Sequence, residues 1–259
     1  MDRKKLLETA ATAEDRILMS KVIDMFSACE NKNIARNTNF LNGHEISVAL
    51  SVASHFNVKH GLFGGYGEAE RMIMLCCPDF LEIEQCVVPI CVIKIRTKNQ
   101  RRLSHRDYMG AILNLGIKRE KIGDIVVCDD CAYVVCMEDI AEYIASQVEK
   151  VGNCGVEISV SSFEDAEIPS KKFKETEASL GSVRLDSVVG AGMGISRSES
   201  SSLVEKGLVS VNWEVKTKCD FRPSEGDIVS VRGYGRLLIC RIGGTSKKGR
   251  TFVTLRKYI

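Results

Sequence analysis

The residues best suited to bind a ligand lie in the last third of the chain. The run Ser196-Arg197-Ser198 stands where a helical pattern begins. A helix N-terminus exposes amides without partners and carries about half a unit of positive charge. Arg197 adds a full charge with a fork of donors, and the two serines add hydroxyl donors. This corner predicts a phosphate site, on the condition that Arg197 is exposed rather than buried against a carboxylate.

More basic side chains and one aromatic residue follow this corner in the sequence. They are Lys206 at the far end of the helix, and then Arg232, Tyr234, Arg236 and Arg241 on predicted strands. Basic groups interleaved with an aromatic ring suit a nucleic-acid backbone with an exposed base that can stack. The alternative is an ordinary capped helix beside solvated strand arginines. In that case Ser196 caps the helix, and Glu199, at its third position, reaches back to the cap amide.

Sequence patterns that would indicate an enzyme or a metal centre are incomplete. His105-Arg106-Asp107 partly matches the H-R-L-D motif of pseudouridine synthases, but the leucine is missing and Asp107 falls where it would cap a helix with Ser104. The glycines between residues 61 and 67 lack the G-K-[ST] ending of a phosphate-binding loop. Cys128 and Cys131 supply two thiols, whereas zinc needs four ligands. We therefore expect no catalytic residue, no metal and no cofactor.

Length and composition predict a protein of several domains whose cysteines are reduced thiols. The 259 residues are enough for two or three domains. The sequence contains no run of 18 apolar residues, so it predicts no membrane-spanning helix. Eleven cysteines, an odd number, and an N-terminus without an apolar signal core point to the cytoplasm. Residues 181–259 carry 14 Lys and Arg against 7 Asp and Glu, while the rest carry 22 against 27. A basic binding module joined to a more acidic body is the expected arrangement.

The first two segments differ in their periodicity. Residues 1–80 are predicted to be mostly helical, with helices at 14–31, 44–56 and, after a break at 61–67, 68–76. Residues 81–162 alternate in type, with the following predicted elements: a strand over 87–97, a helix over 104–115, a hairpin of 125–128 with 132–137, a helix over 138–150 and a strand over 156–160. The order βαββαβ predicts a ferredoxin-like or RRM-like domain.

The remaining chain divides into a linker and a small domain. Residues 163–180 are polar and charged, which indicates a linker that could include an extended edge strand. Residues 181–259 predict two short helices followed by short strands, a compact α+β arrangement. The whole chain is therefore expected to belong to the α+β class.

The middle segment has a basic face of its own. Residues 94–121 carry nine Lys and Arg against two acids. The side chains we expect to contact RNA here are Arg101, Arg102, Arg106, Lys118 and Arg119. The strand over 87–97 contains no Phe or Tyr, so the aromatic signature of a base-stacking RRM is absent. We expect recognition of backbone and shape by this face, and the alternative is a solvated basic surface.

The order of motifs in the last segment resembles the S4 RNA-binding domain. The matching parts, in order, are Arg184-Leu185-Asp186, Ser196-Arg197-Ser198, Leu203–Asn212 and Gly226-Asp227. This resemblance adds Arg184 and Asn212 to the expected RNA-binding set. Two positions depart from the usual pattern: Ser200 stands where many S4 domains have Ala, and Trp213 stands where Gly is common.

The upstream chain resembles the YlmH family of S4 proteins. The block Leu103–Ile125 is the most distinctive part, and Arg232-Gly233-Tyr234-Gly235-Arg236 fits the same family. The resemblance implies a helical N-terminal part, an RRM-like middle and a C-terminal S4 domain. We expect the protein to be a monomer. It also implies binding to rRNA and tRNA at the ribosome, on the large subunit, with links to stalled-ribosome rescue and cell division. Two other readings stay open: an RNA-modifying enzyme and a protein-interaction scaffold.

Overall fold

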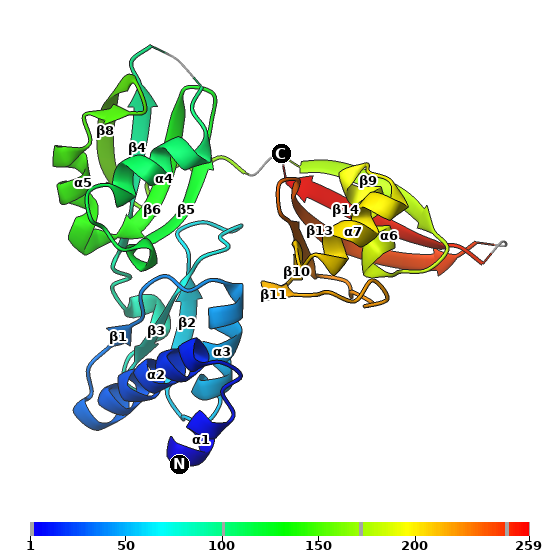
Figure 1. The fold of residues 1–259 in the computed structure, drawn as a ribbon. Coiled ribbons are helices and arrows are strands. Elements are labelled where there is room, and N and C mark those ends of the chain that lie inside the picture. Colours follow the sequence, from blue (N-terminus) through cyan, green and yellow to red (C-terminus); the bar gives the residue numbers. More distant parts are fainter. Residues whose placement is uncertain (1–2, 100–101, 171–172, 247–248, 259) are drawn as a thin grey trace. The chain divides into compact units, whose positions relative to one another are not determined.

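The chain folds into two compact units, Met1–Pro169 and Ser170–Ile259 (Figure 1). The computed structural model describes residues 3–99, 102–170, 173–246 and 249–258. Helices and strands are mixed throughout, which confirms the predicted α+β class. Within these ranges, no helix combines the length and the apolar character that crossing a membrane requires.

The first unit begins with an N-terminal lobe in which helices cover a small sheet. Its elements are α1 (Arg3–Glu8), α2 (Ala13–Lys32), β1 (Arg36–Asn37), α3 (Gly43–Ala53), β2 (Lys59–Phe63), β3 (Ile73–Cys77) and the short 3-10 helix η1 (Ile83–Gln85). The sheet order is β1-β3-β2. Thr12 caps α2 by accepting a hydrogen bond from the Asp15 amide at 3.0 Å. Phe26 of α2 and Ala49 of α3 are fully buried in a common core with Met74 of β3.

The sheet in this lobe corrects part of the sequence prediction. Residues 68–76, predicted to resume a helix, instead lead into β3, and β2 overlaps the first part of the predicted break at 61–67. All five residues of β3 are buried. A strand buried on both faces gives a continuous apolar run, which periodicity does not distinguish from a buried helix.

The rest of the first unit is the middle domain, which contains the predicted βαββαβ elements and one further short strand, β7, before the last strand. Its elements are β4 (Ile90–Thr97), α4 (His105–Leu113), η2 (Arg119–Lys121), β5 (Ile122–Val127), β6 (Cys131–Met137), η3 (Glu138–Ile140), α5 (Ala141–Gln147), β7 (Lys150–Val151) and β8 (Cys154–Ser162). The sheet order is β5-β6-β4-β8-β7. Ser104 and Asp107 form the capping box expected at the start of α4. Ile112 of α4 and Ile144 of α5 are fully buried against the sheet.

The N-terminal lobe and the middle domain share a buried junction. Phe40 and Ile73 from the lobe pack with Val92 and Val135 from the middle sheet. Asp124 of β5 is 9% exposed, and it accepts hydrogen bonds from the Tyr66 hydroxyl at 2.7 Å, the Glu70 amide at 2.8 Å and the Arg71 amide at 3.2 Å. The two parts are therefore joined by an apolar core and by a carboxylate whose oxygens are satisfied across the junction.

The second unit places two helices on one face of a six-stranded sheet (Figure 1). Its elements are β9 (Phe173–Leu180), α6 (Leu185–Met193), α7 (Arg197–Glu205), β10 (Val209–Val211), β11 (Glu214–Val215), β12 (Ile228–Val231), β13 (Gly235–Thr245) and β14 (Thr251–Tyr258). The sheet order is β11-β10-β12-β13-β14-β9. Val188 of α6 and Val204 of α7 are buried against Val229 and Leu237 of the sheet.

The region predicted to link the two units contributes a strand to the second one. Residues 173–180 form β9, which pairs with β14 along its whole length, from Phe173 with Tyr258 to Leu180 with Thr251. The edge strand that the sequence allowed within 163–180 is therefore present. Its charged composition reflects an edge position, where one face and one side of the strand remain in water.

Candidate nucleic-acid interface

The N-terminal ends of α6 and α7 carry the arginines that the sequence singled out. Arg184 is the N-cap residue of α6, and Arg197 is the first residue of α7. Ser196 caps α7 as predicted, because its side chain accepts a hydrogen bond from the Glu199 amide at 3.2 Å. The Ser196 and Ser198 hydroxyls lie 3.1 Å apart. Both serines are exposed, so their hydroxyls can reach a ligand at this helix end.

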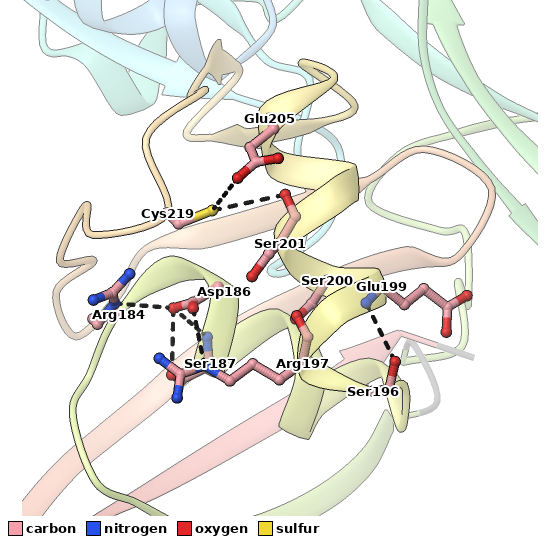
Figure 2. Close-up of polar contacts among 10 residues, drawn as sticks. All are labelled: Arg184, Asp186, Ser187, Ser196, Arg197, Glu199, Ser200, Ser201, Glu205 and Cys219. Atoms are coloured by element: carbon pink, nitrogen blue, oxygen red, sulfur yellow. Dashed lines mark hydrogen bonds and ion pairs between the residues drawn. The ribbon is translucent and has the colours of Figure 1, made fainter.

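A buried carboxylate holds the two arginines in place (Figure 2). Asp186 is 2% exposed; its Oδ1 accepts a hydrogen bond from Nε of Arg184 at 3.2 Å, and its Oδ2 accepts one from Nε of Arg197 at 3.3 Å. The Ser187 amide also donates to Asp186 at 2.9 Å. Arg197 is thus paired with a carboxylate, yet its side chain is 71% exposed and is not buried against that carboxylate. Each arginine contacts Asp186 through Nε, so these two hydrogen bonds do not use the terminal guanidinium nitrogens.

The same arginines line a cavity of about 490 Å³. Its lining consists of Gly181, Ser182, Arg184, Ser187, Arg197, Asp220 and Arg222. The loop that brings Asp220 and Arg222 here is fixed by the Leu185 amide, which donates to the Phe221 carbonyl at 2.8 Å. The cavity is therefore lined by three arginines and by Asp220, and two of these arginines are hydrogen-bonded to the buried Asp186.

Arg222 is the functional candidate that the sequence analysis missed. It lies in the loop between β11 and β12, outside every recognised motif, and it contributed only to the overall count of basic residues. The sequence offered one other sign of a role for Arg222: it is a basic residue beside Pro223, in a loop between the motif segments Leu203–Asn212 and Gly226-Asp227. Its position next to Arg184 depends on the fold and could not be read from spacing.

Arg232 and Arg236 line a second groove, of about 470 Å³, on the sheet. Ser210 and Ser230 pair with each other across β10 and β12, and Ser230 pairs with Arg236 on β13. Side chains alternate along a strand, and the neighbouring valines of β10 and β12 are buried toward α6 and α7. These serines and Arg236 therefore belong to the sheet face that points away from the helices.

Tyr234 and Glu199 interact in a way the sequence did not predict. Glu199 was expected to reach back to the amide of the α7 cap, but its Oε1 accepts a hydrogen bond from the Tyr234 hydroxyl at 2.6 Å. That hydrogen bond raises the pKa of Tyr234. The tyrosine therefore ties the β12–β13 turn to the first turn of α7, and its ring packs partly against the domain core.

Three other predicted residues lie away from the arginine cavity. Lys206 is exposed at the C-terminal end of α7, and Arg241 is exposed on β13. The Asn212 side chain is used within the fold, because it donates to Asp227 Oδ1 at 2.8 Å and accepts from the Ile228 amide at 2.9 Å. Asn212 thus positions a turn, and we retain it as a residue that supports the interface.

Only some of the basic side chains predicted to contact RNA from the middle domain are exposed. Arg102, Arg106 and Lys118 are exposed, whereas Arg101 lies outside the described residues. Arg119 points inward, where its guanidinium donates to the carbonyls of Ile122 and Gly123. Burial, and then the charge of Arg71, lower the pKa of Arg119 to about 10.

Acidic neighbours also offset part of the charge in this segment. Arg96 lies 3.6 Å from Asp130, and Lys121 lies 2.6 Å from Asp139. Exposed pairs of this kind contribute little to stability and can exchange partners. The middle domain is therefore a weaker candidate for phosphate binding than the arginine cavity.

No group of three or more metal-ligating side chains lies close enough to hold a metal among the described residues. All eleven cysteines are free thiols. Cys128 and Cys131 face each other across a hairpin turn, where the Cys128 amide donates to the Cys131 carbonyl at 2.8 Å.

Comparison with known proteins identifies two of the domains. Residues 86–165 match the family model described as "Putative RNA-binding domain in YlmH", and residues 183–229 match the S4 domain. The chain is 28% identical over 245 residues to the ribosome-associated protein quality control protein P2 of Bacillus subtilis, with 94% of this chain and 95% of the relative covered.

A solved structure resembles part of the fold. The cell division protein ylmH from Streptococcus pneumoniae superposes with a TM-score of 0.54 and 21% identity, covering 61% of this chain and 96% of that one. At this level of identity the likeness concerns the fold alone.

Proposed function

Because this chain belongs to the YlmH family of S4-domain proteins, we propose that it is a non-enzymatic factor that binds structured RNA on the ribosome. The observation that carries the proposal is the arginine cavity. Arg184 and Arg197 are held by one buried carboxylate through Nε, and both line the same cavity as Arg222. Guanidinium groups bind phosphate through two donors at once, and pre-ordering lowers the entropy lost on binding.

The contacts available favour recognition of the RNA backbone. The cavity and the sheet groove together offer five arginines, and the Ser196 and Ser198 hydroxyls lie at an exposed helix N-terminus. Phosphate contacts position a protein on nucleic acid without reading its sequence. Arg102, Arg106 and Lys118 of the middle domain form a second, weaker contact in this proposal.

The ribosome is the source of RNA that we favour. The relative from Bacillus subtilis that matches nearly end to end is named a ribosome-associated quality control protein. We extend this to the present chain, and place it in the cytoplasm as a monomer on rRNA and tRNA of the large subunit, in the rescue of stalled ribosomes. Structured RNA offers the closely spaced phosphates that a rigid pair of arginines requires.

The proposal is tested by co-sedimentation with ribosomes. The double variant Arg197→Glu with Arg222→Glu reverses two of the cavity charges and is expected to abolish co-sedimentation while the second unit stays folded. Lys174→Glu is the matched control, because Lys174 is exposed on β9 and lines neither cavity. Unchanged co-sedimentation of the double variant would refute the proposal. Loss of a modified nucleotide from the RNA of a deletion strain would instead indicate an RNA-modifying enzyme.

A further inference from the structure

Asp220 is a carboxylate without a partner in the lining of the arginine cavity. Among the described residues that line this cavity, only Asp220 is acidic. Its side chain is exposed, and within the described part of the chain it forms no hydrogen bond and no ion pair. The nearby Asp186 differs, because it is buried and hydrogen-bonded to two arginines. The cavity therefore offers a ligand both guanidinium donors and one carboxylate acceptor.

The loop that carries this carboxylate is fixed to both helices of the second unit. The Leu185 amide at the start of α6 donates to the Phe221 carbonyl at 2.8 Å. The next amide of α6, that of Asp186, donates to the Cys219 carbonyl at 3.4 Å. The Cys219 thiol donates to the Ser201 carbonyl of α7 at 3.7 Å (Figure 2). Because these contacts lie on both sides of the carboxylate, its backbone has a defined position in the cavity wall.

Side chains along this loop alternate between the core and the cavity. Cys219 and Phe221 pack against the hydrophobic core of the second unit. Asp220 and Arg222 line the cavity. The carboxylate and the guanidinium are thus separated by one residue and lie on the same side of the loop. A ligand that contacts Arg222 in the cavity therefore also meets Asp220.

Phosphate alone does not account for this carboxylate. The negative charge of Asp220 repels a phosphate in the same cavity. Asp220 does not hold an arginine in place either, since it has no ion pair among the described residues. An ionised carboxylate only accepts hydrogen bonds, so a ligand that gains from it carries a neutral donor close to its phosphate. The ribose 2′-hydroxyl of RNA is such a donor, and DNA lacks it.

We propose that Asp220 accepts a hydrogen bond from a ribose 2′-hydroxyl of the RNA whose phosphate the arginines bind, and that it thereby selects RNA over DNA. This inference rests on the proposed RNA-binding function and adds to it the group that the cavity recognises besides phosphate. A hydrogen bond to a charged group strengthens binding about 10-fold or more. An exocyclic amine of a base offers a donor of the same kind, and the probes below separate the two sources.

The test compares two probes for the full-length protein, an RNA hairpin and the same hairpin with fluorine in place of every 2′-hydroxyl. The fluorinated hairpin keeps the bases and the phosphates but has no donor at the 2′ position. Wild type should prefer the unmodified hairpin, and this preference should fall about 10-fold in Asp220→Ala. The affinity of Asp220→Ala for the fluorinated hairpin should not fall, because a charge that repels phosphate is removed.

Two further variants serve as controls for charge and for the acceptor. Glu177→Ala is the matched control, because Glu177 is an exposed acid on β9 that lines neither cavity, and it should keep the wild-type preference. Asp220→Asn keeps an amide oxygen as an acceptor, so it should retain part of the preference. The melting temperature of both Asp220 variants should equal that of wild type, because this exposed side chain has no contact to lose.

Three results would overturn the role of Asp220. They are an unchanged preference in Asp220→Ala, an equal loss of affinity for both hairpins, which would indicate a base amine as the donor, and a lower melting temperature, which would assign the carboxylate to the fold. If Arg197→Glu still weakened binding of both hairpins, the proposed function would survive each of these results. Failure of wild type to bind either hairpin would reject both proposals.

Discussion

Asp186 and Arg197 touch each other, but the structure assigns them opposite roles, and their alanine variants should separate these roles. Asp186 is 2% exposed, whereas the Arg197 side chain is 71% exposed. Asp186→Ala leaves the Ser187 amide without its acceptor, which costs about 1 to 3 kcal/mol. Its contacts to the two more exposed arginines add about 1 kcal/mol after screening by solvent. The free energy of unfolding should therefore fall by about 2 to 4 kcal/mol.

The expected effects on RNA affinity have the reverse order. Arg197→Ala removes an exposed guanidinium, so it should cost less than about 1 kcal/mol of stability. It also removes a charge-assisted contact to phosphate, which should weaken RNA binding about 10-fold or more. In Asp186→Ala the arginines lose their order, at about 0.5 to 1.5 kcal/mol each, but removal of a negative charge returns about 1 kcal/mol. The net cost is about 0 to 2 kcal/mol, so the affinity of Asp186→Ala should fall by about 5-fold, and by about 30-fold at most.

Urea unfolding followed by Trp213 fluorescence measures the stability of the second unit, because the only tryptophan lies there. Anisotropy of a labelled rRNA fragment measures affinity. The reasoning fails if Arg197→Ala destabilises the unit as much as Asp186→Ala and binds RNA as wild type does. Arg197 would then serve the fold and not a ligand.

Three further predictions concern contacts elsewhere in the chain. Asp124→Ala should lower the free energy of unfolding of the first unit by about 3 to 5 kcal/mol, since three donors lose their acceptor, and a change below about 1 kcal/mol in urea titration would contradict the junction described. The hydrogen bond from His44 lowers the pKa of Asp15 below its ordinary 3.8. The ionised Asp15 carboxylate therefore stabilises the fold above pH 3.8, and this stabilisation is lost as the pH falls through the lowered pKa. Acid titration followed by circular dichroism should show a smaller acid-induced loss in Asp15→Asn, and identical profiles would exclude the effect. Asn212→Ala should lower the melting temperature of the second unit, because two side-chain hydrogen bonds are lost. An unchanged melting temperature in calorimetry would show that these hydrogen bonds do not stabilise the turn.

Local patterns in the sequence predicted the elements whose signals are local. The Ser104–Asp107 capping box and the Ser196 cap depend on residues three positions apart, and both are present. The strand over 173–180 was allowed only as an option within a linker, because its partner β14 lies about 80 residues away. The strand over 73–77 was mistaken for a helix because five consecutive buried residues carry no period of two.

The candidate site was also predicted only in part, because sequence patterns indicate local features but not contacts between distant residues. Helix position and charge indicated Arg197, and motif order added Arg184, but neither signal showed that Asp186 holds both. Arg222 reaches the cavity through a loop whose path depends on the Leu185–Phe221 hydrogen bond. Arg119 was counted as an RNA contact because its neighbours are basic, yet the fold turns its guanidinium toward backbone carbonyls.

The salt dependence of RNA affinity tests most directly whether the cavity holds phosphate. If the protein neutralises six to eight phosphates, the logarithm of affinity should fall against the logarithm of salt with a slope of about −5 to −7. Removing Arg184, Arg197 and Arg222 together should bring that slope closer to zero by about 2 to 3. A triple variant that keeps the wild-type slope and affinity would show that these guanidinium groups face water and not an RNA backbone.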